Sequence, residues 1–397
     1  MIALFDAGRA LRASSAAGRG HARGVRGKGE GMATKKNEKR AVTEPNLPAS
    51  GKTARVALIR QIQKARESRV IAYVTNTRQG LDVHMALDVV RYVFDHLQAI
   101  SEAHKGSGKP RIDLFIHSNG GDGTMPWRLV TLIREFTDHL GVLVPHRAFS
   151  AATLTALGAD EVVMHPMGML GPTDATVANA FNPPDPANPQ RKLGISVEDV
   201  TAYIQLVKDD AGIQHEDELV QSLNILATNV HPLALGNVKR SMSQSRMMAR
   251  KLLELHMDAN QRHKIDEIVD NLTSKLFFHG HPINRREARE QIGLSTVTDS
   301  SGDLETAIWD LYLQYEAEMK LIEAFDPPME FGRHHDIQAM PVGQTLATTP
   351  ASNKFVYVES EFITHVSQDE YVLQGTKQPN GALQVAIFNL KRGWAIE

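Results

Sequence analysis

The stretch "RIDLFIHSNGGDGTMPWRLVTLIREFTDHLGVLVPHRAFSAATLTALGADEVVM", residues 111–164, decides the fold of this chain. Short, continuous apolar runs alternate in it with amphipathic segments of helical length. Strands that are apolar on both faces, and that are separated by helices, are typical of a parallel sheet covered by helices on both sides. The stretch therefore predicts an α/β fold.

The same alternation extends upstream, and downstream it gives way to helices. The expected upstream elements are a helix over 54–66, a strand over 68–76 and a helix over 82–100. Residues 171–192 are rich in Pro and Asn and read as a long loop, and a loop of this length is often functional. From 214 to about 325 the pattern is almost wholly helical.

The C-terminal part has a different composition. Residues 326–350 are rich in Pro, Gly and Thr, which indicates a linker. Two strand-like runs follow, and Asn380-Gly381 between them is a strong β-hairpin signal. The expected organisation is a disordered extension over 1–53, an α/β domain with a helical extension over 54–325, a linker over 326–350 and a small β segment over 351–397.

The first 53 residues are rich in Gly, Ala, Ser and Arg and contain few large apolar side chains. Such a segment cannot bury enough surface to offset its ordering entropy, so we expect it to be disordered. Two other interpretations stay open. An Arg-rich, acid-poor start can mimic an organellar transit peptide, and Met32 opens the start-like "MATKKNEKR".

Composition excludes several classes of function. The 397 residues include no cysteine, which excludes disulfides, thiolate zinc sites and cysteine nucleophiles. The formal net charge of -2 gives no sign of a nucleic-acid partner. No apolar run approaches the roughly 18–20 residues of a membrane span, so we expect no integral membrane segment. The close pairs His279–His281 and His334–His335 have no matched acidic partner at a spacing typical of a metal site, so we expect neither a metal nor a cofactor.

Ser150 follows an expected strand and opens a helix of small residues, "SAATLTAL". The first turn of a helix offers N–H groups without helical partners and a positive potential. A serine at this place can cap the helix. It can also attack a carbonyl carbon while the N–H of Ala151 helps to hold the oxyanion. The residues alone leave both roles open.

The motif "SNGGDG", residues 118–123, follows the strand before it. Adjacent glycines let the backbone approach a ligand and turn N–H groups outward, toward a phosphate or an oxyanion. A tight strand-to-helix turn is the alternative. The pattern is neither a phosphate-binding Walker loop nor a dinucleotide fingerprint, because the Lys-Ser/Thr pair and the third glycine are missing.

Together with "GHPINRREAREQIGLSTVTD" (280–299), these motifs resemble in their order the Clp-type and signal-peptide-peptidase-type serine proteases. They are most similar to the serine dehydrogenase proteinase family. The resemblance covers about 68–299 and implies a Clp/crotonase-like spiral with a mostly parallel sheet. With the patterns described above, we expect a largely helical segment and a C-terminal β-hairpin after it.

The resemblance also implies a function. It makes the chain a cytoplasmic serine endopeptidase that acts on peptides or proteins and assembles into a homo-oligomer. Ser150 becomes the nucleophile, and the N–H groups of Gly121 and Ala151 form the oxyanion hole. Gly121 is the second glycine of the pair, which is the one that the family motif uses.

The general base is less clear, because the sequence departs from the Ser-His-Asp pattern of Clp-type enzymes. The segment "GPTDAT" after the serine holds no histidine. Other members of the superfamily use a lysine, and Lys192, at the end of the long loop, is the expected base. Lys208 is a second choice. A further alternative pairs Ser150 with His165 and Asp174.

Two other functions stay open at this point. Crotonase-like enzymes of the same fold use paired N–H groups on acyl-CoA thioesters without a serine nucleophile. The missing histidine and acid also allow a catalytically inactive scaffold.

Overall fold

The computed structural model describes residues 51–173, 176–177, 179–274 and 280–397. All but the last three residues of the expected disordered extension lie outside this part. The helices are α1 (Lys52–Arg66), α2 (Val89–Ala103), α3 (Met125–Phe136), α4 (Ala151–Leu157), α5 (Val197–Gln205), α6 (Glu216–Asn229), α7 (Pro232–Leu253), α8 (Arg262–Ser274), α9 (Arg285–Glu287), α10 (Gly302–Met319) and α11 (Pro327–Gly332), with short 3-10 or π turns at 206–210, 259–261 and 288–292.

The strands are β1 (Arg69–Thr75), β2 (Ile112–His117), β3 (Leu140–Val144), β4 (Arg147–Ala148), β5 (Glu161–Met164), β6 (Met169–Leu170), β7 (Thr176–Val177), β8 (Pro184–Asp185), β9 (Asn188–Lys192), β10 (Ile195–Ser196), β11 (Ile283–Asn284), β12 (Val297–Asp299), β13 (Thr345–Ala347), β14 (Ala351–Glu359), β15 (Thr364–Lys377) and β16 (Leu383–Ile396).

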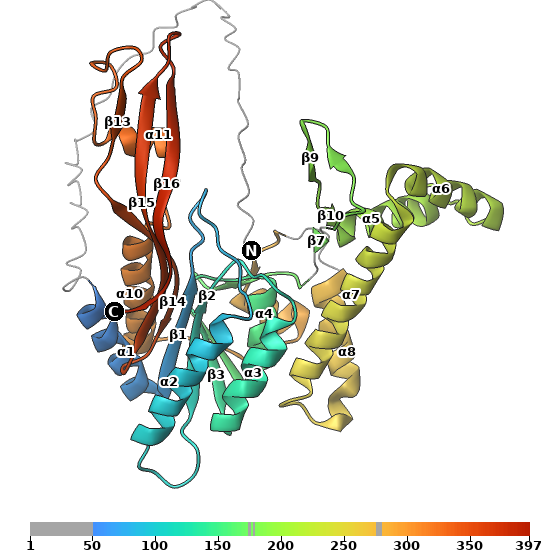
Figure 1. The fold of residues 1–397 in the computed structure, drawn as a ribbon. Helices are drawn as coiled ribbons and strands as arrows, with labels where there is room; N and C mark the ends of the chain where they lie inside the picture. Colours follow the sequence, from blue (N-terminus) through green and yellow to red (C-terminus); the bar gives the residue numbers. More distant parts are fainter. Residues whose placement is uncertain (1–50, 174–175, 178, 275–279) are drawn as a thin grey trace, which may run out of the picture. The chain divides into compact units, whose positions relative to one another are not determined.

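Within the described residues the main sheet has nine strands, in the order β12-β5-β3-β2-β1-β14-β15-β13, with β16 beside β15 (Figure 1). The pairs from β12 through β5, β3 and β2 to β1 are all parallel. Consecutive parallel strands thus lie side by side with helices between them, as the alternation of apolar runs predicts. The carboxyl ends of β1, β2 and β3 consequently meet at one edge of the sheet.

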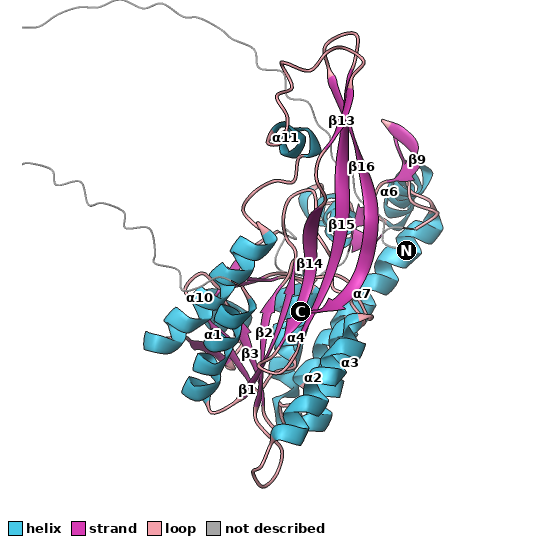
Figure 2. Cartoon of the chain, turned by 60° about the vertical axis from the view of Figure 1, so that its left-hand side comes forward, coloured by secondary structure: helices cyan, strands magenta, loops and turns pink. Residues whose placement is uncertain are grey.

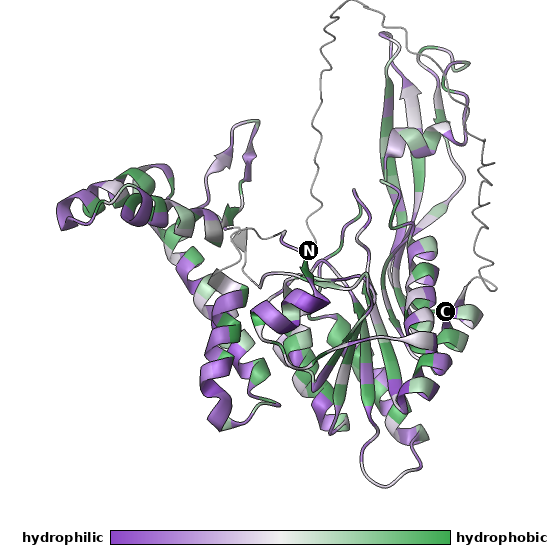
Figure 3. Cartoon of the chain, turned by 180° about the vertical axis from the view of Figure 1, so that it is seen from behind, coloured by the Kyte–Doolittle hydropathy of each residue, from purple (hydrophilic) through white to green (hydrophobic). Residues whose placement is uncertain are grey.

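The two faces of this sheet bury different helices. Helices α2, α3, α4, α7 and α8 contribute to the core on one face, and α1 and α10 contribute to the core on the other. The alternation along β5 illustrates the division, since Val162 and Met164 lie in the first core and Val163 in the second. The colouring in Figure 3 shows that the central strands are mostly hydrophobic, as burial on both faces requires.

A small second sheet, β11-β6-β4, lies next to the carboxyl end of β2, with β4 parallel to β6. An isolated parallel bridge between Ser118 and Ala148 links this sheet to the end of β2. The mostly parallel sheet with this side layer fits the expected Clp/crotonase-like α/β fold, and the helices from α6 to α8 fit the expected helical segment.

The C-terminal strands extend the main sheet. β14 pairs antiparallel with β1, and β15 and β16 form the hairpin that Asn380-Gly381 predicts (Figure 2). The expected linker region contains α11 and β13, and β13 pairs with β15. Residues 351–397 therefore share one sheet with β1 and β2.

Two expectations about local structure need correction. The helix expected over 82–100 begins only at Val89, because Val83 and Met85 donate sheet-like backbone hydrogen bonds to Asn76 and Gly120. The long loop 171–192 contains a short hairpin, β8–β9, among its described residues. In the part of the chain that the structure describes, no helix is long and apolar enough to cross a membrane.

Candidate active site

The Gly-Gly turn after β2 is pinned on one side by a neighbouring segment. The carbonyl of Gly120 accepts a hydrogen bond from the N–H of Met85 (2.8 Å), and the N–H of Asp122 donates to the carbonyl of Met85 (2.9 Å). Because the groups before and after Gly121 both pair with Met85, the N–H of Gly121 itself points away from that segment. The position requires glycine, since a methyl group there would lie 2.3 Å from the Met85 carbonyl oxygen.

Ser150 lies at a sharp turn from strand into helix. Its φ of 52° and ψ of -112°, with the hydrogen bond from the Ala152 N–H to the Phe149 carbonyl (2.9 Å), define a type II′ turn in which glycine is the usual residue at this position. A non-glycine residue in such a conformation costs on the order of 1–3 kcal/mol and is characteristic of functional sites. The hydroxyl makes no capping hydrogen bond to α4, so helix capping does not explain the serine.

The structure brings the Gly-Gly turn and Ser150 together. The N–H of Ser118 donates to the Arg147 carbonyl (2.9 Å), and the N–H of Phe149 donates to the Ser118 carbonyl (3.0 Å). A methyl group on Gly120 would lie 2.7 Å from Cβ of Ser150 and 3.0 Å from the backbone N of Ala151. The first N–H groups of α4 and the Gly-Gly backbone therefore border the same serine.

Lys192 is the last residue of β9, and its side chain is exposed. It pairs with Pro184 of β8 in the short hairpin. Among the described residues no hydrogen bond joins Lys192 to Ser150, so its role as base stays a prediction. Lys208 is also exposed, in the π-helical turn at 206–210.

His165 follows β5, and its ring stacks on Trp309 of α10, with centroids 4.8 Å apart. Burial lowers its pKa, and the nearby charges act in opposite directions. Its Nδ1 accepts the N–H of Met167 (3.1 Å). Trp309 packs against the core on the face opposite to the one that α4 covers, which sets the His165 ring apart from Ser150. Its proposed partner Asp174 lies outside the described residues.

Sequence reasoning did not single out the residues that support the site. Thr75, Ser118 and Met85 all contact the Gly-Gly turn or one another at the strand ends. A serine two residues before a glycine is a signal for a local side-chain turn, and it could have identified Ser118. The pairing of Met85 with the turn has no such signal, because it joins segments that are distant in sequence.

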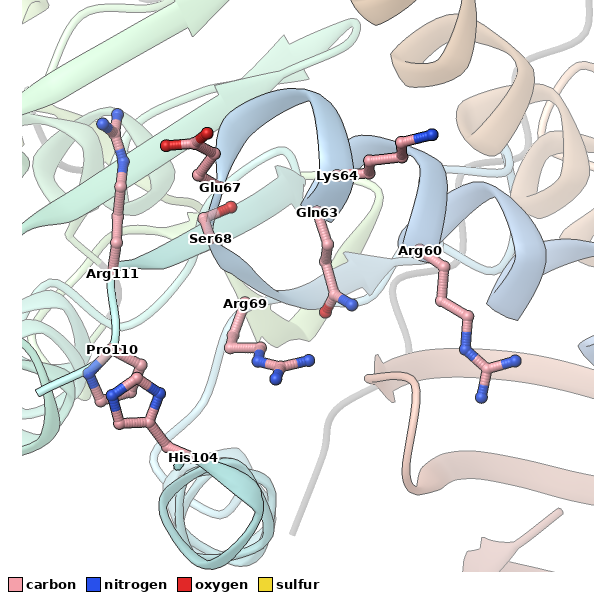
Figure 4. Close-up of a pocket in the computed structure, with 9 residues that line it drawn as sticks. All are labelled: Arg60, Gln63, Lys64, Glu67, Ser68, Arg69, His104, Pro110 and Arg111. Atoms are coloured by element: carbon pink, nitrogen blue, oxygen red, sulfur yellow. The ribbon is translucent and has the colours of Figure 1, made fainter. Parts of the chain in front are cut away.

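A separate pocket lies at the opposite edge of the sheet, where β1 and β2 begin (Figure 4). Basic side chains line it, but most of them have acidic partners. Arg60 and Arg69 both form ion pairs with Glu361, and Arg111 pairs with Glu161. Its position at the amino ends of the strands separates it from Ser150, which follows the carboxyl end of β3.

The chain is similar to one protein family and to several individual proteins. Residues 44–226 match the family described as ClpP-like SDH-type serine proteinase. Two uncharacterized proteins of Methanocaldococcus jannaschii are similar to the chain. One is 25% identical over 281 residues, which cover 70% of this chain and 85% of that protein. The other is 24% identical over 221 residues, which cover 51% and 75% respectively.

Among solved structures, the chain is similar to a mutant of the 1510-N membrane-bound stomatin-specific protease in complex with a substrate peptide. The identity is 14% and the TM-score 0.24, and the match covers 62% of this chain and 98% of that one.

Proposed function

We propose that this chain, whose residues 44–226 match the ClpP-like SDH-type serine proteinase family, is a peptidase with Ser150 as its nucleophile. The observation that carries the proposal is the strained φ of 52° at Ser150, in a sharp strand-to-helix turn beside Gly120-Gly121. Strain at a serine whose hydroxyl does not cap its helix has no structural benefit, whereas the same turn exposes a nucleophile.

The proposed mechanism uses the groups around this serine. The Ser150 hydroxyl oxygen attacks the peptide carbonyl carbon, and the N–H groups of Gly121 and Ala151 stabilise the oxyanion of the tetrahedral intermediate. Lys192 accepts the serine proton and returns it to the leaving amine, which gives an acyl-serine ester. The Lys192 amine then activates a water molecule, which hydrolyses the acyl-serine ester.

The assignment of Lys192 as base requires a movement of the hairpin β8–β9. A lysine acts as a base near neutral pH only when it is withdrawn from water. The Lys192 side chain is exposed, so the proposal includes a movement that brings the hairpin over Ser150 when a substrate binds. Arg191 beside it is excluded, since a guanidinium stays protonated.

The test is covalent labelling with a fluorophosphonate, which reacts with activated serines. We expect Ser150→Ala to abolish labelling and Lys192→Ala to slow it by about 100-fold or more, since general-base catalysis typically contributes about 100- to 10,000-fold. Ser301→Ala is the matched control, because Ser301 is also an N-cap whose side chain makes no capping hydrogen bond. Lys208→Ala tests the second choice of base.

Each outcome points to one assignment. Labelling that survives Ser150→Ala overturns the nucleophile assignment. A normal rate in Lys192→Ala, with a loss in Lys208→Ala, moves the base to Lys208. A wild-type chain that never labels points to the thioester enzyme or the inactive scaffold, and binding of acyl-CoA then separates these two.

A further inference from the structure

Two buried hydroxyl groups lie directly beneath the Gly-Gly turn. Thr75 ends β1 and Ser118 follows β2, and both side chains are fully buried. The hydroxyl of Thr75 donates to Oγ of Ser118 (2.9 Å), and the N–H of Gly120 donates to the same oxygen (3.0 Å). One serine oxygen thus accepts two hydrogen bonds, and one of them comes from the backbone of the turn.

The backbone of Ser118 connects to the other side of the site. Its N–H donates to the Arg147 carbonyl, and its carbonyl accepts the N–H of Phe149, at 2.9 and 3.0 Å. Phe149 directly precedes Ser150. Ser118 therefore contacts both halves of the site, the glycine turn through its side chain and the serine turn through its main chain.

The two halves of the site lie so close together that a side chain on Gly120 would not fit between them. A methyl group on Gly120 would meet Ser150 Cβ at 2.7 Å and the Ala151 nitrogen at 3.0 Å. Ser118 holds the peptide group between Asn119 and Gly120. A small rotation of the backbone at Gly120 would change where the N–H of Gly121 points relative to Ser150. Oxyanion stabilisation depends on donors that are fixed before the reaction begins.

We infer that Ser118, held by Thr75, is a positioning residue that fixes the Gly121 N–H against Ser150. The inference rests on the proposed function, because it assigns Ser118 a part in that site. Without the Ser118 oxygen, the buried Gly120 N–H and the Thr75 hydroxyl lose their acceptor, and the turn relaxes to satisfy them elsewhere.

The experiment measures fluorophosphonate labelling of Ser150 over a range of probe concentrations. In Ser118→Ala we expect the maximal labelling rate to fall about 10- to 100-fold, the loss typical of a displaced catalytic group, with little change in the half-saturating concentration. Thr75→Val should give a smaller fall in the same direction, and Thr75→Ser, which keeps the donor, should restore the rate.

Ser300→Ala is the control for a buried serine. Its hydroxyl bonds to Glu305 and to the Met164 carbonyl rather than to the Gly-Gly turn. We expect this variant to label at the wild-type rate. If Ser118→Ala does not fold, the contrast between Thr75→Val and Thr75→Ser decides the question.

Amide hydrogen exchange at Gly120 gives a readout that does not depend on catalysis. Exchange should accelerate in Ser118→Ala and stay slow in Ser300→Ala. If Ser118→Ala labels with wild-type kinetics, this inference is overturned and the proposed function stands. If Ser118→Ala does not fold, wild-type kinetics in Thr75→Val have the same consequence. A wild-type chain without any labelling overturns the proposed function and this inference with it.

Discussion

Two buried polar regions of this molecule differ in backbone geometry and in how their polar groups are paired. The first, which we call the framework cluster, comprises Arg55, Tyr315, Glu359 and Thr364. Arg55 Nε donates to Glu359 at 2.7 Å, and the hydroxyls of Tyr315 and Thr364 donate to the same carboxylate at 2.6 and 2.8 Å. The cluster joins α1 and α10 to the ends of β14 and β15.

Burial alone would lower the pKa of Arg55, but its hydrogen bond and ion pair with Glu359 outweigh that effect and raise it. Both side chains are almost completely buried. Every charge in the framework cluster is therefore matched, and its backbone lies in ordinary helices and strands.

The second region is the candidate site, where the backbone departs from ordinary helix and strand geometry. The Ser118 hydroxyl oxygen accepts the Gly120 N–H, and Met85 pairs with the groups on either side of Gly121. Ser150 holds a conformation that glycine usually takes. The contrast indicates that backbone strain, rather than buried polarity as such, distinguishes the candidate site from the framework cluster.

The largest expected effect concerns the framework cluster. Glu359→Gln should lower the free energy of unfolding by about 3 kcal/mol, because it leaves the buried Arg55 without its main counter-charge. Urea denaturation measures this loss. Glu290→Gln, at the exposed ion pair with Arg286, should change stability by less than about 0.5 kcal/mol. Equal losses in both variants would contradict the comparison.

A smaller effect should appear as pH dependence beside the same cluster. His96 bonds to Ser360 and His365, at 2.8 and 3.1 Å. Burial, followed by the charge of His365, lowers the pKa of His96 to about 3, although Asp95 acts in the opposite direction. Below pH 6.5 the unfolded chain binds a proton here that the folded chain does not, so stability is lost as pH falls.

One such proton is worth about 1.4 kcal/mol per pH unit. Between pH 7 and pH 5, His96→Gln should therefore lose about 2 kcal/mol less stability than the wild type does, as measured by urea denaturation at both pH values. An identical loss would show that His96 titrates normally in the folded chain.

The smallest expected effect concerns strain in the site. Ser150→Gly relieves a positive φ, so it should be about 1 kcal/mol more stable than Ser150→Ala, which keeps the side-chain carbon and its strain. Thermal unfolding of the two variants compares them directly. If Ser150→Ala is as stable as Ser150→Gly, the turn at Ser150 is unstrained, and its conformation no longer supports a functional site there.

Much of the fold and part of the site follow from local patterns. Apolar runs identify the strands β1, β2, β3 and β5, and Asn380-Gly381 identifies the β15–β16 hairpin. Small residues after Ser150 and the paired glycines after β2 mark both halves of the candidate site. These features are predictable because they depend on neighbours within a few residues, through side-chain periodicity and turn chemistry.

The sequence by itself thus determined the α/β alternation, the place of Ser150 at a helix start and the glycines that the turn requires. Only the tertiary structure decided that β14 lies beside β1, that Met85 occupies one side of Gly121 and that Ser118 contacts both halves of the site. Those contacts join segments that are far apart along the chain, such as Arg55 and Glu359. No local pattern encodes them, because they depend on which surfaces pack together when the sheet and its helices assemble.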